Sequence, residues 1–154
     1  MMRVLLDTNI LLDYFAHRDP HYQSARKLML FAALGEFELW ASSSQLTDVF
    51  YLLTSGQDKL SSDEAKESLQ RLRRIVHVCS MGEEEVDAAL LSAWEDFEDA
   101  CVFQIALKVK AEAIASRNAK DFIRSPIRVL SCEELFAHIE KEKGISYDEI
   151  VFPS

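Results

Sequence analysis

The chain has 154 residues, 49% of them hydrophobic and 28% charged, which predicts one globular domain large enough to bury a core. Its apolar stretches fall well short of the roughly 18 residues of a membrane-spanning helix, and Asp7 comes too early for the apolar segment of a signal peptide, so we expect a cytoplasmic protein with no membrane partner. The formal net charge of −9 argues against a general nucleic-acid binder, because attraction to phosphate is the main sequence-independent contribution to such binding, unless a cation offsets the carboxylates.

Short apolar runs alternate along the chain with longer segments of helical periodicity. In chain order we expect a strand at 4–6, helices at 9–15 and 21–34, a strand at 37–41, helices at 43–53 and 61–74, a strand at 75–79, helices at 83–94 and 96–110, strands at 113–115 and 127–130, and a helix at 132–143. This alternation predicts an α/β fold of three layers, α/β/α, around a central, mainly parallel sheet. We assign residues 1–143 to one domain and 144–154 to a C-terminal tail of undetermined structure, because no linker or repeat divides the chain.

Acidic residues follow two of the predicted strands. Asp7 comes directly after the strand at 4–6, and Asp121 lies in the polar loop after the strand at 113–115. Ligands of open parallel sheets gather at the carboxyl ends of the strands, so both positions are candidates for a site. Each also has a structural explanation, since Asp7 suits the cap of the next helix and the loop at 116–122 suits a turn with its own cap.

Asp48 lies in the predicted helix at 43–53, whose other residues are apolar on nearly every side. A carboxylate in such a helix would not easily reach water, and burying it without a partner costs free energy that a metal or a basic group would offset. The alternative is that Asp48 shares an exposed stripe of the helix with Ser44 and Gln45.

Four carboxylates surround the predicted start of the helix at 96–110, namely Glu95, Asp96, Glu98 and Asp99. The helix dipole favours acids there, and Asp96 with Asp99 resembles a capping box. Capping explains Asp96 better than it explains four acids, because like charges this close repel each other. The helical period also turns Asp99 toward the packed side of the helix rather than outward.

Soft metal ligands and histidine bases are scarce in this chain. The three cysteines have no C-x-x-C spacing, which predicts reduced thiols rather than a disulfide framework or a zinc site, and the four histidines form no H-x-x-x-H pair. Carboxylate oxygens without such ligands suit a hard cation, Mg²⁺ or Mn²⁺. Such a cation would let an acidic site approach phosphate.

Four segments together resemble the ordered motifs of PIN domains, over about residues 2–140. They are V-L-L-D-T-N-I-L-L-D at 4–13, the helix around Asp48, D-F-E-D-A at 96–100 and S-R-N-A-K-D-F at 116–122. PIN domains are metal-dependent ribonucleases, and many are toxins of bacterial toxin–antitoxin pairs. The resemblance therefore implies a PIN-like fold and an enzyme that uses Mg²⁺ or Mn²⁺ to cut RNA. An antitoxin protein and a second copy of the chain, in a homodimer, are the implied candidate partners.

The resemblance also implies roles for individual residues. The implied metal ligands are Asp7, Asp48 and Asp99, the implied catalytic acids are these three with Asp121, and the implied substrate contacts are Thr8, Ser116, Arg117 and Asn118. Two positions depart from the family pattern. Glutamate is usual where Asp48 stands, and many relatives carry an acid where Asn118 stands, so either Asp121 or Asn118 completes the set.

These roles describe hydrolysis of a phosphodiester without a histidine base. A cation held by Asp7 and Asp99 would orient a water and lower its pKa, while Asp48 would bind a second cation or orient that water. Candidates for holding flanking RNA, or equally for ordinary solvated surface charge, are Arg117, Lys120, Arg124 and Arg128.

Two other functions stay open on the sequence. One is a catalytically weak member that binds RNA or a protein without cutting. The other is a Mg²⁺-dependent phosphatase, which would normally have an acid where Asn9 stands.

Overall fold

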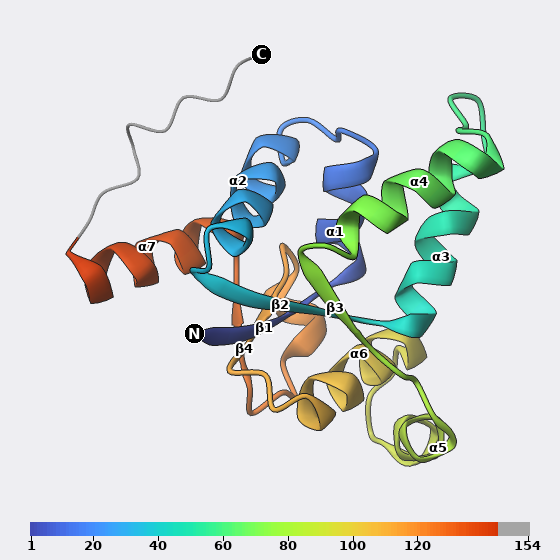
Figure 1. Ribbon diagram of the computed structural model, residues 1–154. Coiled ribbons are helices and arrows are strands. Elements are labelled where there is room, and N and C mark those ends of the chain that lie inside the picture. The colour runs from blue at the N-terminus through green and yellow to red at the C-terminus, as the bar shows by residue number, and fades with distance from the viewer. Residues whose placement is uncertain (145–154) are drawn as a thin grey trace.

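A computed structural model describes residues 1–144 of the chain (Figure 1). The predicted tail, apart from Gly144, lies outside the described residues. The strands are β1 (Met2–Leu6), β2 (Phe37–Ser42), β3 (Val76–Cys79), β4 (Ala113–Ala115) and β5 (Arg128–Leu130). They form one five-stranded sheet in the order β3-β2-β1-β4-β5, and each neighbouring pair is parallel. The predicted parallel sheet is confirmed.

Helices cover both faces of this sheet. They are α1 (Thr8–Phe15), α2 (Tyr22–Ala33), α3 (Ser43–Leu53), α4 (Ser62–Leu72), α5 (Glu83–Leu91), α6 (Phe97–Lys108), α7 (Cys132–Lys143) and a short 3₁₀ turn, η1 (Ala119–Phe122). Figure 1 shows α1, α2 and α4 over one face and α5 and α6 over the other, which gives the three predicted layers. Among the described residues, every helix is too short or too polar to cross a membrane.

Four helices, α2, α4, α5 and α6, end one to three residues earlier than expected, and the backbone shows why for the last two. The helix predicted to reach Trp94 ends at Leu91, because Ser92 has an extended backbone with φ −72° and ψ 163°. The helix predicted to reach Lys110 ends at Lys108, and Lys110 itself has φ 57°, a left-handed conformation that an α-helix cannot include.

The core is divided between the two faces of the sheet. In β1, Val4 and Leu6 belong to the core under α1, α2 and α7, while Leu5 belongs to the second core under α6. All three side chains are fully buried, as expected for a central parallel strand covered on both sides. The unbroken apolar run at 4–6 is therefore the sequence signature of this position in the sheet.

Three helices begin at serines that satisfy otherwise unpaired backbone donors. Ser42, Ser61 and Ser131 each cap a helix, and the Gln or Glu three residues later completes a capping box. The box at Ser42 places α3 directly after β2, at the carboxyl end of the sheet.

The strand order puts a change of direction at β1. The chain leaves β1 for β2 and β3 on one side and returns later to β4 and β5 on the other. The Asp7 amide donates to the Ala115 carbonyl over 2.9 Å, which holds the ends of β1 and β4 together. In open α/β sheets, the crevice outside the strand ends at such a switch point is where ligands bind.

Candidate active site

An acidic cavity of about 540 Å³ opens at this carboxyl edge. Six carboxylates line it, namely Asp7, Asp48, Asp96, Glu98, Asp99 and Asp121. They come from the end of β1, from α3, from the start of α6 and from η1. All four predicted catalytic acids are thus in one cavity, although 114 positions separate the first from the last in the chain, residue 7 from residue 121.

Asp7 is both a helix cap and a member of the cavity. Its side chain is only 4% exposed, and Oδ1 accepts the Thr8 amide over 2.8 Å at the start of α1. Oδ2 accepts the Ser116 hydroxyl over 2.7 Å. Burial raises the pKa of the Asp7 carboxyl, and these two hydrogen bonds oppose that rise. Asp7 can therefore cap α1 and also belong to the functional site, the two roles that the sequence left open.

Gln45 connects this acid to helix α3. Its side chain is 2% exposed, and its Nε2 donates to the Leu6 carbonyl over 2.8 Å and to the Thr8 hydroxyl over 3.1 Å. Its Oε1 accepts the Ser42 amide over 2.8 Å. Gln45 was considered from the sequence only as part of the alternative exposed stripe with Ser44 and Asp48, and this role was missed. The available signal was its position as the third residue of a capping box.

The burial argument for Asp48 was wrong. Its side chain is exposed and needs no partner to offset desolvation. Helix α3 turns apolar side chains into the cavity as well as into the core, since Tyr51 and Leu52 line the cavity and are 68% and 47% exposed. Asp48 nevertheless lies at the wall of the acidic cavity, which is where the PIN resemblance expects an acid.

Among the acids of the cavity, Asp99 has the most strongly shifted pKa. Burial raises the pKa of its carboxyl to about 7, helped by the negative charges of Asp96, Asp7, Asp121 and Glu98. Asp96 caps α6 by accepting the Asp99 amide over 2.9 Å, as expected, but Asp99 does not return the bond, so there is no full capping box. The Asp99 side chain is left half-buried among like charges.

The loop after β4 contributes one carboxylate to the cavity. Asp121 is exposed and lines it, whereas Asn118 is not among the lining residues. Asn118 uses its backbone instead, where its amide donates to the Ser116 hydroxyl over 3.0 Å and its carbonyl accepts the Asp121 amide over 2.9 Å. The geometry thus favours Asp121 over Asn118 for completing the acidic set.

Two predicted substrate contacts have other partners. Ser116 is 2% exposed, and its hydroxyl is engaged by Asp7 and by the Asn118 amide, which suits it to orienting Asp7 rather than touching phosphate. The guanidinium group of Arg117 donates two hydrogen bonds to the Asp13 carboxylate, from Nε to Oδ2 over 2.7 Å and from Nη2 to Oδ1 over 3.1 Å. Asp13 is fully buried, so Arg117 neutralises it and ties α1 to the β4–η1 loop.

Arg128 is not beside the site. It lies at the beginning of β5, in register with Ala113 at the beginning of β4, which is the opposite edge of the sheet. It lines a different hollow, together with Glu112, His138 and Lys143. The expectation that Arg128 supplies charge beside the site was therefore wrong, because the start of a parallel strand lies at the edge opposite to the carboxyl ends.

The donor set of the cavity fits a hard cation. Within residues 1–144, no three acidic, histidine or cysteine side chains stand in a formed metal-ligand arrangement. The lining acids offer only oxygen donors, and burial, together with the repulsion among these acids, raises the pKa of Asp99. An oxygen-only, negatively charged and half-buried pocket is the environment that Mg²⁺ and Mn²⁺ prefer.

The raised pKa of Asp99 predicts how stability depends on pH without metal. Its folded-state pKa of about 7 exceeds the usual 3.8, so its stabilising effect is complete below pH 3.8 and is lost as the pH rises through 7. In EDTA, Asp99→Asn should therefore gain stability relative to wild type between about pH 5 and pH 8. Urea unfolding midpoints of both proteins at the two pH values measure this. A difference between the two proteins that does not change with pH would contradict it.

The Arg117–Asp13 pair predicts a structural role for Arg117. Arg117→Ala leaves a fully buried carboxylate without its partner and should lower the free energy of unfolding by about 3 kcal/mol. Adding Asp13→Asn should restore part of this loss, because no buried charge then remains. If Arg117→Ala is as stable as the wild type but binds RNA more weakly, the structural role is contradicted and Arg117 contacts the substrate.

The comparisons with known proteins agree with the fold and the motifs. The PIN domain family profile matches residues 3–120, about three quarters of the chain. Ribonuclease VapC1 of Aquifex aeolicus is 26% identical over 137 residues, which cover 86% of this chain and 92% of that protein.

Solved structures share the fold at low sequence identity. VapBC2 from Rickettsia felis, solved with a DNA fragment from its promoter, superposes with a TM-score of 0.61 at 18% identity, covering 84% of this chain and 98% of that one. Mycobacterium tuberculosis VapC20, described as a Sarcin-Ricin loop cleaving toxin, has a TM-score of 0.61 at 17% identity, covering 79% and 94%. A toxin–antitoxin complex from Klebsiella pneumoniae has a TM-score of 0.60 at 19% identity, covering 84% and 97%. With the family profile matching most of its length, the chain belongs to the PIN domain family.

Proposed function

We propose that this protein is a divalent-metal-dependent ribonuclease that hydrolyses RNA phosphodiester bonds in the acidic cavity, and that it is the toxin of a toxin–antitoxin pair. The observation that carries the proposal is the gathering of Asp7, Asp48, Asp99 and Asp121 at the switch point of the sheet. Membership of the PIN family and a relative named as a ribonuclease support the same reaction.

Asp7 and Asp99 are the residues we assign to holding Mg²⁺ or Mn²⁺, with Asp48 and Asp121 beside them. Such a cation supplies an activated water and offsets the charge of the scissile phosphate. Burial and repulsion among the acids raise the pKa of Asp99, and a bound cation would offset that repulsion. The acidic chain can then approach a polyanion at this one place.

The surrounding residues orient these acids. Ser116 and the Thr8 amide each donate to one oxygen of Asp7, which fixes the carboxylate while leaving further lone pairs on both oxygens. Thr8 accepts from Gln45 and lines the cavity, so its own hydroxyl hydrogen is available to a phosphate oxygen. Among residues 1–144, no histidine lines the cavity, and none is needed for proton removal in this mechanism.

A protein antitoxin is the partner we propose, with the cytoplasm as the compartment. The supporting observation is that neighbours in fold were solved as VapBC assemblies from Rickettsia felis, Salmonella typhimurium and Haemophilus influenzae. Purification of the tagged protein from its native cells, followed by size-exclusion chromatography and identification of any small protein that co-purifies, distinguishes a heteromeric complex from a homodimer of this chain.

The first functional prediction concerns Asp7→Asn. This change preserves the capping oxygen but removes one carboxylate charge from the proposed metal site, so RNA cleavage in Mg²⁺ or Mn²⁺ should fall by orders of magnitude. The far-UV CD spectrum should stay unchanged, and metal-free stability should rise because the Asp7 carboxylate is buried among repelling charges. The matched control is Asp58→Asn, an exposed acid outside the cavity, which should cleave like wild type.

Wild-type cleavage by Asp7→Asn would contradict the assigned mechanism. Parallel assays with a labelled RNA and a generic phosphate monoester separate the rival functions. Binding of RNA without cleavage by the wild type would indicate a binding module, and turnover of the ester alone would indicate a phosphatase.

The second prediction concerns metal and stability. An ion that binds only the folded state stabilises it by mass action, by about 2.7 kcal/mol at one hundred times its Kd. Millimolar Mn²⁺ should therefore raise the melting temperature of the wild type by several degrees and that of Asp7→Asn much less. Differential scanning fluorimetry with and without Mn²⁺ measures both. Equal shifts in the two proteins would place the ion elsewhere.

A further inference from the structure

A second hollow of about 300 Å³ lies beside the acidic cavity. Asp96, Asp99 and Asp121 line both, so the two hollows are adjacent. The second hollow, called here the Trp94 hollow, differs in chemistry because its other lining residues are an aromatic, an aliphatic, one further acid and two cations, namely Trp94, Ile123, Glu95, Lys120 and Arg124.

Trp94 stands in the loop between α5 and α6, where the predicted helix fails to continue. Phe103 stacks on its ring at 4.9 Å between centroids, and Phe122 meets it edge-on at 5.7 Å, so the indole is held in place. The side chain is still only half-buried. Within residues 1–144, its indole N–H has no hydrogen-bond partner, whereas the N–H of Trp40 donates to Glu38 over 2.9 Å.

Ile123 adds exposed apolar surface to the same hollow. Its side chain is 85% exposed, which makes it one of the most exposed large hydrophobic residues of the described chain. A rigid aromatic ring and an aliphatic side chain at the wall of one hollow offer the kind of surface on which a nucleobase stacks.

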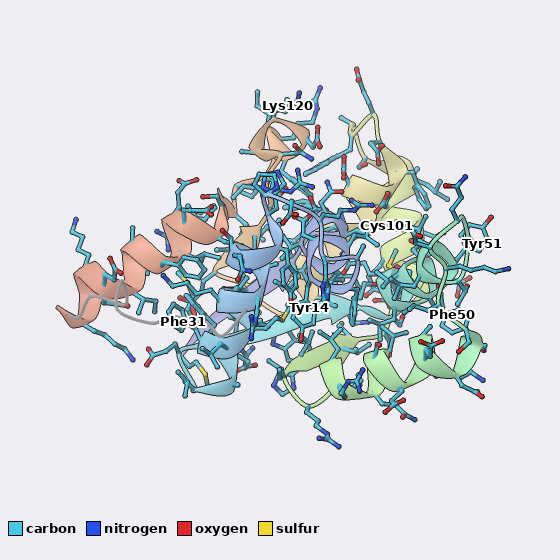
Figure 2. All side chains as sticks on the ribbon, turned by 90° about the horizontal axis from the view of Figure 1, so that it is seen from above. Tyr14, Phe31, Phe50, Tyr51, Cys101 and Lys120 are labelled. Atoms are coloured by element: carbon cyan, nitrogen blue, oxygen red, sulfur yellow. The ribbon has the colours of Figure 1, made fainter. Side chains whose placement is uncertain are left out.

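Lys120 and Arg124 supply positive charge there. Neither forms an ion pair with a described residue, although Asp96, Asp121 and Glu95 line the same hollow. Lys120 stands outward on the η1 turn (Figure 2). By contrast, Arg117 is committed to buried Asp13, so it does not serve as a free cation near the site. Two uncommitted cations beside an aromatic ring match the pairing of charge and stacking used for single-stranded nucleic acid.

We propose that the Trp94 hollow binds the nucleotide next to the scissile phosphate, with its base stacked on Trp94 and its phosphate held by Lys120 and Arg124. This inference rests on the proposed ribonuclease function and deepens it. A base can reach Trp94 only when it is outside a helical stack, so the RNA must be unpaired at that nucleotide. Trp94 would then select an unpaired base, while the carboxylates next to it act on the backbone.

The test uses the intrinsic fluorescence of Trp94. The chain has two tryptophans, so Trp40→Phe leaves Trp94 as the sole reporter, and Asp7→Asn in the same protein suppresses cleavage. Titration with a single-stranded oligoribonucleotide in Mg²⁺ should quench this fluorescence in a saturable way. An abasic strand of equal length should not quench it. The variant Trp94→Phe with Asp7→Asn, which reports from Trp40 alone, should show no change.

The two cations provide a test that does not depend on packing. Lys120→Gln with Arg124→Gln changes only exposed side chains and should raise the Kd for the strand about tenfold or more, with a weaker dependence on salt. The matched control, Lys59→Gln with Lys66→Gln, removes the same charge away from the hollow and should change the Kd much less. In wild-type background, the first pair should also lower cleavage of single-stranded RNA.

Equal quenching by the abasic strand, or equal effects of the two cation pairs, would overturn the proposal. The outcome is separate from that of the proposed function. If the wild type cleaves RNA but RNA does not quench the fluorescence of Trp94, only the proposed nucleotide subsite is contradicted. Quenching of Trp94 by RNA without any cleavage by the wild type would support the subsite and remove the ribonuclease.

Discussion

Repulsion among carboxylates held in one half-buried cavity is the constraint around which the functional edge of this protein is organised. Asp7 is buried at the end of the central strand, and Asp99 is half-buried opposite other acids, so the pKa of each is raised. Such a group of charges opposes folding unless it is partly protonated or neutralised by a cation. We therefore expect this edge to be more stable with a bound cation than without one.

Hydrogen bonds between distant segments hold these acids in place. Gln45 joins α3 to the end of β1, Ser116 fixes the Asp7 carboxylate, and the Arg117–Asp13 pair fastens the loop after β4 to α1. Gln45, Ser116 and Asp13 are buried and hydrogen-bonded, so the geometry does not depend on the exposed acids themselves. Preorganised donors and carboxylates of this kind are what electrostatic catalysis requires.

The fold could be predicted closely from the sequence, because the apolar runs and the helix-capping residues indicated the same strands and helices. Continuous apolar runs such as 4–6 indicated buried parallel strands, and Ser61 and Asp96 indicated helix starts that the structure contains. The acidic cavity also followed, since parallel strands end at one edge. Residues whose surroundings depend on distant segments were missed. Arg117 binds Asp13, which lies 104 positions away in the chain. Asp48 is exposed because its apolar neighbours Tyr51 and Leu52 line a cavity rather than a second core.

An acidic chain with a net charge of −9 can bind RNA if a cation offsets the acids of the cavity and the phosphate contacts are confined to that place. The most direct test is a crystal grown with Mn²⁺, examined by anomalous scattering at the manganese edge. We expect a strong peak in the acidic cavity within coordinating distance of Asp7 and Asp99. A well-resolved map at millimolar Mn²⁺ with no peak in that cavity, or with peaks only on other surfaces, would contradict it.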